Sequence, residues 1–241
     1  MKKELTQTLR DLLEPEEKIL ALWLGGSDAT ARADHLSDID LVMISPDPDF
    51  IFKRVEEELG SSISIRYIVT DGPYPQRFYV LKGTPETFYL DIVIFTELNP
   101  DYYREYFNVR RHGIPHILLD RKGILSEAAR NPKSETPELN PQNEMGRFEI
   151  IYRTFLKESL RDHYTDAFNF YFRLVQILNK ILRTKHTPDR HDFGLRYNYS
   201  DFPKEETLFL ERMLKVTTLK QMQMNAKLMY DKVTHELGVL Q

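Results

Sequence analysis

Cysteine is absent from the 241-residue chain. This absence excludes disulfide bonds, thiolate metal ligands and cysteine nucleophiles, and it fits a reducing compartment. Long apolar runs are missing too, because no window approaches the roughly 18 apolar residues that a membrane-spanning helix needs. The charged residues 1–13 do not have the apolar stretch of a signal peptide. We therefore expect a cytoplasmic protein with no membrane partner.

An excess of positive charge is also missing. The formal net charge is -4 and the isoelectric point is about 6.0, so no overall basic field indicates a nucleic-acid partner. Hydrophobic residues make up 41% and charged residues 29% of the chain, which is typical of a soluble globular protein. The length allows one large domain or two small ones.

The first half of the sequence alternates between helical and extended patterns. We predict helices over 3–13, 28–34 and 50–59, and strands over 19–24, 39–44, 62–69, 77–81, 87–95 and 116–119. This order predicts an α+β fold with a mixed sheet and flanking helices.

The second half has a different composition. Residues 129–145 contain prolines and asparagines but few apolar residues, as in a linker. Apolar residues then recur at helical spacing over 149–182 and 204–237, on either side of an irregular polar segment at 185–203. We predict a catalytic domain at 1–128, a linker at 129–145 and a helical bundle at 146–241.

Two aspartates stand at the start of one predicted strand. Asp38 and Asp40 are two residues apart, so their carboxylates project from the same side of the strand, about 7 Å apart at the backbone. Two carboxylates that close repel each other and raise each other's pKa. A divalent cation between them removes this repulsion, and oxygen ligands without cysteine or histidine suit Mg²⁺ or Mn²⁺.

A third acid interrupts another strand. Asp91 lies within the apolar run 89–95. Burial of an unpaired polar group costs about 2–7 kcal/mol, and burial of an unpaired charge costs more. A cation shared with the neighbouring strand makes this placement tolerable. Asp38, Asp40 and Asp91 are therefore the predicted metal ligands and catalytic residues.

A glycine-rich turn precedes the paired aspartates. Gly25, Gly26 and Ser27 follow the first predicted strand and precede a predicted helix. Glycines let backbone amides approach a phosphate, the start of a helix favours anions, and the Ser27 hydroxyl adds a donor. We predict that these three residues bind the phosphates of a nucleotide.

Taken together, these residues resemble a known signature. Gly26-Ser27, ten intervening residues, Asp38-x-Asp40 and a downstream Asp91 are similar to the motif of the DNA polymerase β-like nucleotidyltransferase superfamily. The motif covers only about residues 20–95. The order of domains, a minimal nucleotidyltransferase core followed by a helical bundle, resembles the aminoglycoside and lincosamide nucleotidyltransferases of bacteria.

The resemblance implies an activity. It implies transfer of a nucleoside monophosphate, often AMP from ATP, to a hydroxyl of a small molecule such as an aminoglycoside-like antibiotic, with pyrophosphate leaving. Two Mg²⁺ ions, or Mn²⁺ in their place, would be held by Asp38 and Asp40, and Asp91 would serve the ion on the acceptor side. Drug-modifying relatives often complete the site as dimers, so a homodimer is an open alternative to a monomer.

Basic residues of the second half are further candidates for phosphate binding. Arg190 and Arg196 belong to the polar segment between the predicted helices, and Lys180 lies near the end of the helix before it. We predict that these three contact the triphosphate. A solvated loop and a surface lysine are the alternative interpretations.

Three acids of the second half are further candidates for the general base. Glu158, Asp162 and Asp166 are four residues apart, as on one stripe of a helix. In drug-modifying relatives an acid of the helical domain acts as general base or binds a cationic acceptor. The base is therefore either Asp91 or one of these three, and a solvated helix face is the structural alternative.

Two other functions are compatible with the same motif. The acceptor is a protein in nucleotidyltransferases of toxin-antitoxin systems, and degenerate members of the superfamily bind nucleotides without catalysis. The presence of all three acids argues against degeneration. The acceptor and the preferred base of the triphosphate do not follow from the sequence.

Overall fold

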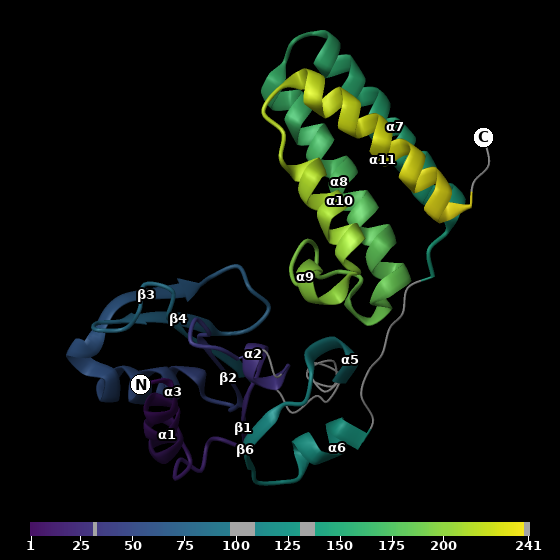
Figure 1. Cartoon of the computed structure of the whole chain (residues 1–241). Helices are drawn as coiled ribbons and strands as arrows, with labels where there is room; N and C mark the ends of the chain where they lie inside the picture. Colours follow the sequence, from purple (N-terminus) through teal and green to yellow (C-terminus); the bar gives the residue numbers. More distant parts are fainter. Residues whose placement is uncertain (31–32, 97–108, 131–137, 239–241) are drawn as a thin grey trace. The chain divides into compact units, whose positions relative to one another are not determined.

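The chain folds into two compact units, Met1–Ser134 and Glu135–Gln241. The computed structural model describes residues 1–30, 33–96, 109–130 and 138–238 (Figure 1). The division falls inside the predicted linker 129–145, but helical residues extend to Arg130 and begin again at Pro141. Residues 131–137 of that predicted linker lie outside the described part of the chain.

The first unit is built on a six-stranded mixed sheet with the strand order β3-β4-β5-β2-β1-β6. β2 and β5 are parallel, and the other neighbours are antiparallel. The α+β class with a mixed sheet is therefore as predicted. The elements in chain order are α1 (Lys2–Leu13), β1 (Ala21–Leu24), α2 (Gly26–Ala29), β2 (Ile39–Ile44), α3 (Pro48–Leu59), the 3-10 turn η1 (Gly60–Ser62), β3 (Ile63–Val69), β4 (Gln76–Leu81), β5 (Leu90–Phe95), α5 (Val109–His112), β6 (His116–Asp120) and α6 (Ile124–Arg130).

The helix predicted over 28–34 is wrong in extent. In the described residues of this stretch the helix is the single turn α2, which starts at the glycines. Further along, the Asp34 side chain accepts a hydrogen bond from the Leu36 amide at 2.9 Å and one from the Ser37 hydroxyl at 3.0 Å. Such local bonds from a short acidic side chain favour a turn over a helix.

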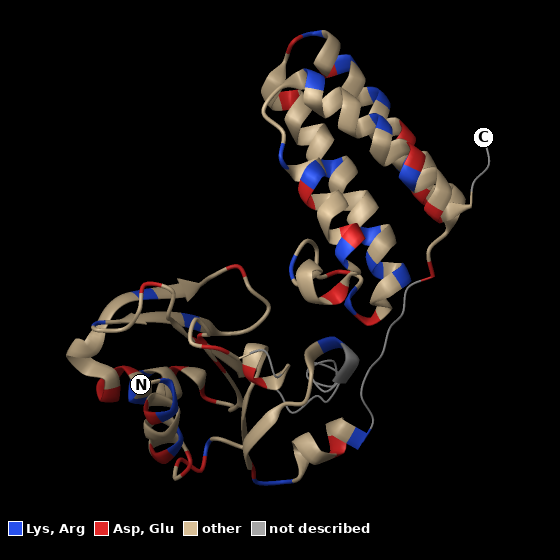
Figure 2. Cartoon of the chain, in the orientation of Figure 1, with Lys and Arg blue, Asp and Glu red and all other residues tan. Residues whose placement is uncertain are grey.

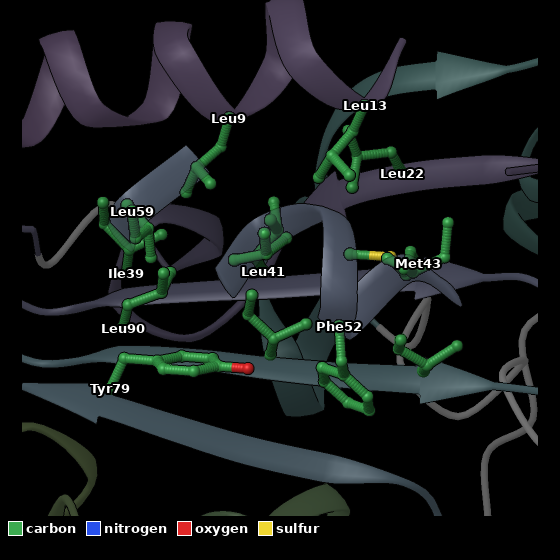
Figure 3. Packing of buried hydrophobic residues seen from close by; sticks show 14 of the residues in the cluster. Leu9, Leu13, Leu22, Ile39, Leu41, Met43, Phe52, Leu59, Tyr79 and Leu90 are labelled. Carbon is green, nitrogen blue, oxygen red and sulfur yellow. The ribbon is translucent and has the colours of Figure 1, made fainter. Parts of the chain in front are cut away.

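One face of the sheet is buried under two helices. Leu9 and Leu13 of α1 and Phe52 of α3 pack on a continuous apolar layer of the strands (Figure 3). The other face carries a smaller cluster, in which Trp23 stacks on Phe95 with ring centroids 6.1 Å apart and α6 packs nearby. The aspartates of β2 and β5 share this second face with Trp23, since side chains alternate along each strand.

The second unit is a helical bundle, as predicted. Its elements are α7 (Pro141–Leu160), α8 (Tyr164–His186), the 3-10 turn η3 (Pro188–Arg190), α9 (Asn198–Asp201), α10 (Lys204–Leu214) and α11 (Leu219–Leu237). Helices α7, α8, α10 and α11 surround one apolar core. Among the residues described, no helix combines the length and apolarity required to cross a membrane.

The two long helices predicted over 149–182 and 204–237 are each divided in the structure. The first breaks between α7 and α8, where Asp162 takes a left-handed backbone with φ 60°. The second breaks before α11, where the Thr218 side chain caps the new helix by accepting from the Gln221 amide at 3.2 Å. The apolar periodicity continues across both breaks because all four helices face the same core.

A buried arginine holds the polar segment after α8. Arg183 is fully buried. Its guanidinium donates to the Gly194 carbonyl at 2.6 Å, to Asn198 Oδ1 at 2.9 Å and to the Asp201 carboxylate at 3.1 Å. The irregular segment is therefore fixed to the bundle by charged hydrogen bonds from one side chain.

Candidate active site

The three predicted acids lie together on one face of the sheet. Asp40 of β2 and Asp91 of β5 are directly opposite each other in the parallel pair, and neighbouring strands are about 4.8 Å apart. Asp38 immediately precedes β2, and its charge acts on both of the other two carboxylates. The structure thus places Asp38, Asp40 and Asp91 in one cluster.

Burial and mutual repulsion change the acidity of this cluster. The pKa of Asp40 is raised from 3.8 to about 7, first by burial and then by the charges of Asp38, Asp91 and Asp28. The pKa of Asp91 is raised from 3.8 to about 6, again chiefly by burial. The described residues therefore leave these carboxylates short of positive charge, which is the electrostatic condition of a cation site.

Gln76 orients the acid of β5. Its amide Nε2 donates to Asp91 Oδ1 at 2.8 Å and to Asp91 Oδ2 at 3.0 Å, and these bonds lower the pKa of Asp91 against the effect of burial. The sequence prediction missed this residue. Gln76 begins β4, and only the pairing of β4 with β5 brings it to Asp91.

The glycine turn packs against the paired aspartates. The Gly25 amide donates to the Asp40 carbonyl at 2.9 Å. Gly26 has φ +52°, and a Cβ atom there would lie 1.7 Å from Asp40 Oδ2, so no other residue fits without a shift of the carboxylate or the turn. The Ser27 hydroxyl oxygen is buried and has no hydrogen-bond partner among the described residues. An unpaired buried hydroxyl at this point is available to a ligand.

Two further side chains approach the acids and were missed in the sequence. Lys2 of α1 forms an ion pair of 2.9 Å with Asp28, and its charge partly offsets the rise in the pKa of Asp40. The Tyr89 hydroxyl is hydrogen-bonded to Asp38, and this bond is the main reason that the pKa of Tyr89 is raised. Neither residue belongs to a local motif, so only the tertiary fold reveals them.

The basic residues predicted to bind phosphate all have contacts inside the second unit. Lys180 Nζ donates to Glu144 at 2.5 Å. Arg190 is buried and forms an ion pair of 2.6 Å with Asp201. The Arg196 guanidinium lies 5.4 Å from the centre of the Phe193 ring, in the arrangement of a cation–π contact. Their predicted role in nucleotide binding stays a prediction.

A cavity of about 490 Å³ in the second unit has a basic lining that includes Lys180. Arg147 of α7, Arg173 of α8 and His191 also line it, together with a single acid, Asp192. The lining suits a small anion better than a cation. The sequence prediction did not identify Arg147 and Arg173, because they lie on separate helices and only bundle packing brings them together.

The predicted stripe of acids on one helix is wrong. Glu158 is in α7 and Asp166 in α8, whereas Asp162 lies in the turn between them. Glu158 is instead bonded to Arg161 at 2.9 Å and to His163 at 3.0 Å. Ligand atoms of Glu158, His163 and Asp166 lie within 4.8 Å of one another, and the hydrogen bond between Glu158 and His163 accounts for two members of this cluster.

Two of the solved structures that resemble this chain cover nearly all of it. One is a nucleotidyltransferase-like protein from Exiguobacterium sibiricum 255-15, at 12% sequence identity and a TM-score of 0.43, over 98% of this chain and 74% of that protein. The other is the spectinomycin adenyltransferase AAD(9) from Enterococcus faecialis, solved with ATP and spectinomycin, at 11% identity and a TM-score of 0.33, over 99% of this chain and 100% of that protein.

No protein-family model and no curated protein matches the sequence. Because both identities and both TM-scores are low, the function proposed below rests on the residues of the site itself.

Proposed function

We propose that the protein is a metal-dependent nucleotidyltransferase that moves AMP from ATP to a hydroxyl group of a small molecule and releases pyrophosphate. The observation that carries this proposal is the cluster of Asp38, Asp40 and Asp91, in which Asp40 directly contacts the glycine turn. A cluster of carboxylates beside a phosphate-binding turn is what transfer of a phosphoryl group requires of a protein.

The donor set suits magnesium. All three side chains offer hard oxygen ligands, and the pKa of about 7 at Asp40 reflects a charge that the surrounding protein does not neutralise. Mg²⁺, or Mn²⁺ with similar ligand preferences, would supply that charge. Asp38 and Asp40 would contribute ligands to both ions, and Asp91 would contribute a ligand to the ion on the acceptor side. When bound, such ions neutralise charge on the transferring phosphoryl group and make the acceptor hydroxyl more acidic.

The glycine turn is proposed to bind the triphosphate. Its backbone amides can approach phosphate oxygens because Gly25 and Gly26 have no side chains. The buried Ser27 hydroxyl donates a further hydrogen bond in this proposal. Contact between Gly26 and Asp40 ties the turn to the carboxylates, so that the α-phosphate and the acids have a fixed separation.

In the proposed reaction the acceptor oxygen attacks the α-phosphorus, the bond from phosphorus to the bridging oxygen breaks, and pyrophosphate leaves. The hydroxyl proton passes to a carboxylate. Asp91 is the proposed base, because it lies beside Asp40 on the flank from which β4 and β3 extend, and a carboxylate in that place can accept the proton of the acceptor hydroxyl. The two hydrogen bonds from Gln76 hold both of its oxygens in place. Glu158, Asp162 and Asp166 are the alternative bases.

A transfer assay tests the proposal. ATP labelled at the α-phosphate is incubated with Mg²⁺ and a panel of hydroxylated small molecules that includes spectinomycin, streptomycin, kanamycin and lincomycin. Labelled AMP on an acceptor, with stoichiometric pyrophosphate, is expected. Asp38→Asn and Asp40→Asn should abolish transfer, whereas Asp71→Asn, a change of an exposed aspartate between β3 and β4, should not. Absence of transfer from all four common triphosphates to every acceptor would refute the proposal.

Measurements on the same protein distinguish the two other functions from transfer to a small molecule. A mass increase of a co-expressed protein by one AMP, without transfer to small molecules, would indicate a protein acceptor. Calorimetric binding of MgATP with no turnover on any acceptor would indicate a regulatory nucleotide-binding protein. Charged side chains of both signs are interspersed along the helices of the second unit (Figure 2), which does not favour a long polyanionic acceptor.

A further inference from the structure

A row of side chains crosses the sheet from the acids to its edge. Residues opposite each other on paired strands share a face, and the register places one residue of each of four neighbouring strands in line. In order from β2 to β3 these are Asp40, Asp91, Phe78 and Tyr67. The carboxylates thus continue directly into aromatic side chains on the same face.

The aromatic side chains form a connected surface. The Tyr67 and Phe78 rings are stacked with centroids 6.0 Å apart, and Phe78 meets Tyr89 edge-on at 5.7 Å. Tyr89 in turn is hydrogen-bonded to Asp38. We call Tyr67, Phe78 and Tyr89 the aromatic platform. It has one end at the acids and the other at the edge strand β3.

The platform is exposed although it is apolar. Tyr67 is 56% and Tyr89 37% exposed, and Ile65, which is opposite Val80 in the adjoining row, is 59% exposed. Tyr67 and Tyr89 are joined through Phe78, and Ile65 shares the face of Tyr67 on the same strand. Exposed apolar side chains that form such a patch beside a candidate active site indicate a ligand surface, whereas single exposed apolar residues do not.

The platform lies on one particular side of the acids. The glycine turn follows β1, which borders β2 on one flank, whereas β5, β4 and β3 extend from the other flank. In transfer of a phosphoryl group the attacking oxygen and the leaving group are roughly in line, on opposite sides of the phosphorus. With the triphosphate on the flank of the glycine turn, the acceptor approaches from the flank of the platform.

Charge limits which acceptors fit this surface. The arginines of β3 and β4, Arg66 and Arg77, belong to the opposite face and are paired with Glu56 at 2.8 and 2.7 Å. Among the described residues, the charges that act on Tyr89 of the platform are those of Asp38, Asp40 and Asp91, and bound Mg²⁺ would offset them. Aromatic faces attract C–H groups and ammonium groups that carry partial or full positive charge, so a neutral or cationic acceptor is favoured over an anionic one.

We propose that the aromatic platform binds the acceptor, and that this acceptor is a neutral or cationic glycoside. The flat C–H face of a sugar ring lies on Tyr67 and Phe78, and a hydroxyl at the edge of the ring reaches Asp91. This assignment rests on the proposed nucleotidyl transfer for the identity of the site. It adds the surface that holds the acceptor, and no residue of this surface was among the site residues predicted from the sequence.

Binding without turnover tests the assignment. The probes are spectinomycin, kanamycin and methyl α-D-glucopyranoside, titrated in saturation-transfer NMR with the full chain, Mg²⁺ and a non-hydrolysable ATP analogue. In the wild type, at least one probe should bind and receive saturation at its ring C–H protons. Tyr67→Thr, which keeps a strand-forming residue on an edge strand, should raise the dissociation constant of that probe about tenfold.

Matched variants separate the platform from general damage. Tyr67→Phe keeps the ring and should bind like the wild type. Ile68→Thr changes a neighbour on the opposite face of the same strand, with 42% exposure, and should also leave the dissociation constant unchanged. The dissociation constant of the ATP analogue should be the same in all variants, and in the transfer assay Tyr67→Thr should raise the KM of the acceptor and not that of ATP.

Other results would overturn the assignment. It fails if no probe binds the wild type, if Tyr67→Thr leaves acceptor binding intact, or if it weakens binding of the ATP analogue equally. A changed sedimentation coefficient of Tyr67→Thr would show that the platform contacts protein, which also overturns it. If glycosides bind the platform but no nucleotide is transferred, the proposed function fails and the platform stands. If nucleotide is transferred to glycosides and Tyr67→Thr leaves this transfer unchanged, the proposed function stands and the assignment of the platform fails.

Discussion

Replacement of Asp40 by asparagine should stabilise the metal-free protein although it abolishes transfer. A carboxylate whose pKa is raised from 3.8 to about 7 in the folded protein binds its proton more tightly there than in the unfolded chain. Folding is therefore opposed when the pH keeps this group ionised. The penalty is absent below about pH 4, grows as the pH rises through the interval to 7, and is complete above it.

The size of the effect follows from the pKa. The change from 3.8 to about 7 corresponds to about 4 kcal/mol as an upper bound. Because Asp40 is only partly buried and the neighbouring carboxylates share the repulsion, we expect about 1–2 kcal/mol of stabilisation by Asp40→Asn at pH 8. At 2–4 °C per kcal/mol for a chain of this size, the melting temperature should rise by roughly 2–8 °C.

Differential scanning calorimetry of the metal-free protein measures this rise. The expected increase at pH 8 should shrink to less than half at pH 4.5, where most of Asp40 in the wild type is already protonated. Addition of Mg²⁺ at pH 8 should stabilise the wild type and not Asp40→Asn, because binding of an ion to the folded state adds to its stability. Asp71→Asn is the matched control and should change neither value.

Two results would refute the reasoning. If Asp40→Asn lowers the melting temperature at pH 8, the carboxylate makes favourable contacts that outweigh repulsion. If it raises the melting temperature equally at both pH values, the effect has a cause other than ionisation. In either case the acids would not be short of positive charge, and the electrostatic argument for a cation would fail.

The remaining predictions concern the turn, the positioning amide and the bundle. Gly26→Ala should destabilise the protein in urea unfolding by about 1–3 kcal/mol more than Gly60→Ala. Both glycines have positive φ, but only at Gly26 would the added Cβ lie 1.7 Å from the Asp40 carboxylate, whereas at Gly60 it would meet nothing; the Gly60 change should cost only about 1 kcal/mol. Gln76→Leu should lower kcat about tenfold or more with little change in the KM of ATP, since it frees Asp91 to rotate; an unchanged kcat would contradict the positioning role. Arg183→Met should destabilise the second unit by about 3–5 kcal/mol in chemical denaturation, because it removes the buried guanidinium that bonds Gly194, Asn198 and Asp201; a loss below 1 kcal/mol would contradict this.

The acids show what local sequence can determine. Asp38 and Asp40 share a side because side chains alternate along a strand, and this needs no knowledge of the rest of the fold. The strand over 39–44 was predicted with its observed bounds, because a compact apolar run between turn residues is a strong local signal. The position of Asp91 inside a buried strand was likewise readable from its apolar neighbours.

Helix boundaries in the second half were less readable. The breaks at Asp162 and before Thr218 depend on one left-handed residue and one capping hydroxyl. Apolar periodicity is insensitive to both, since the helices on either side of each break face the same core. The existence of a helical bundle was therefore predictable, whereas the number of helices in it was not.

By itself, the sequence determined the class of fold, the acids and the glycine turn, since each depends on residues close together along the chain. Only the tertiary structure decided what surrounds them. Gln76 reaches Asp91, and Tyr67 and Phe78 continue the row of acids, because β4 pairs with β5 and β3 in one register. A slip of two residues would keep the same side chains on the same face but move each to other neighbours. The alternating pattern of a strand is unchanged by such a slip, so it does not contain this information.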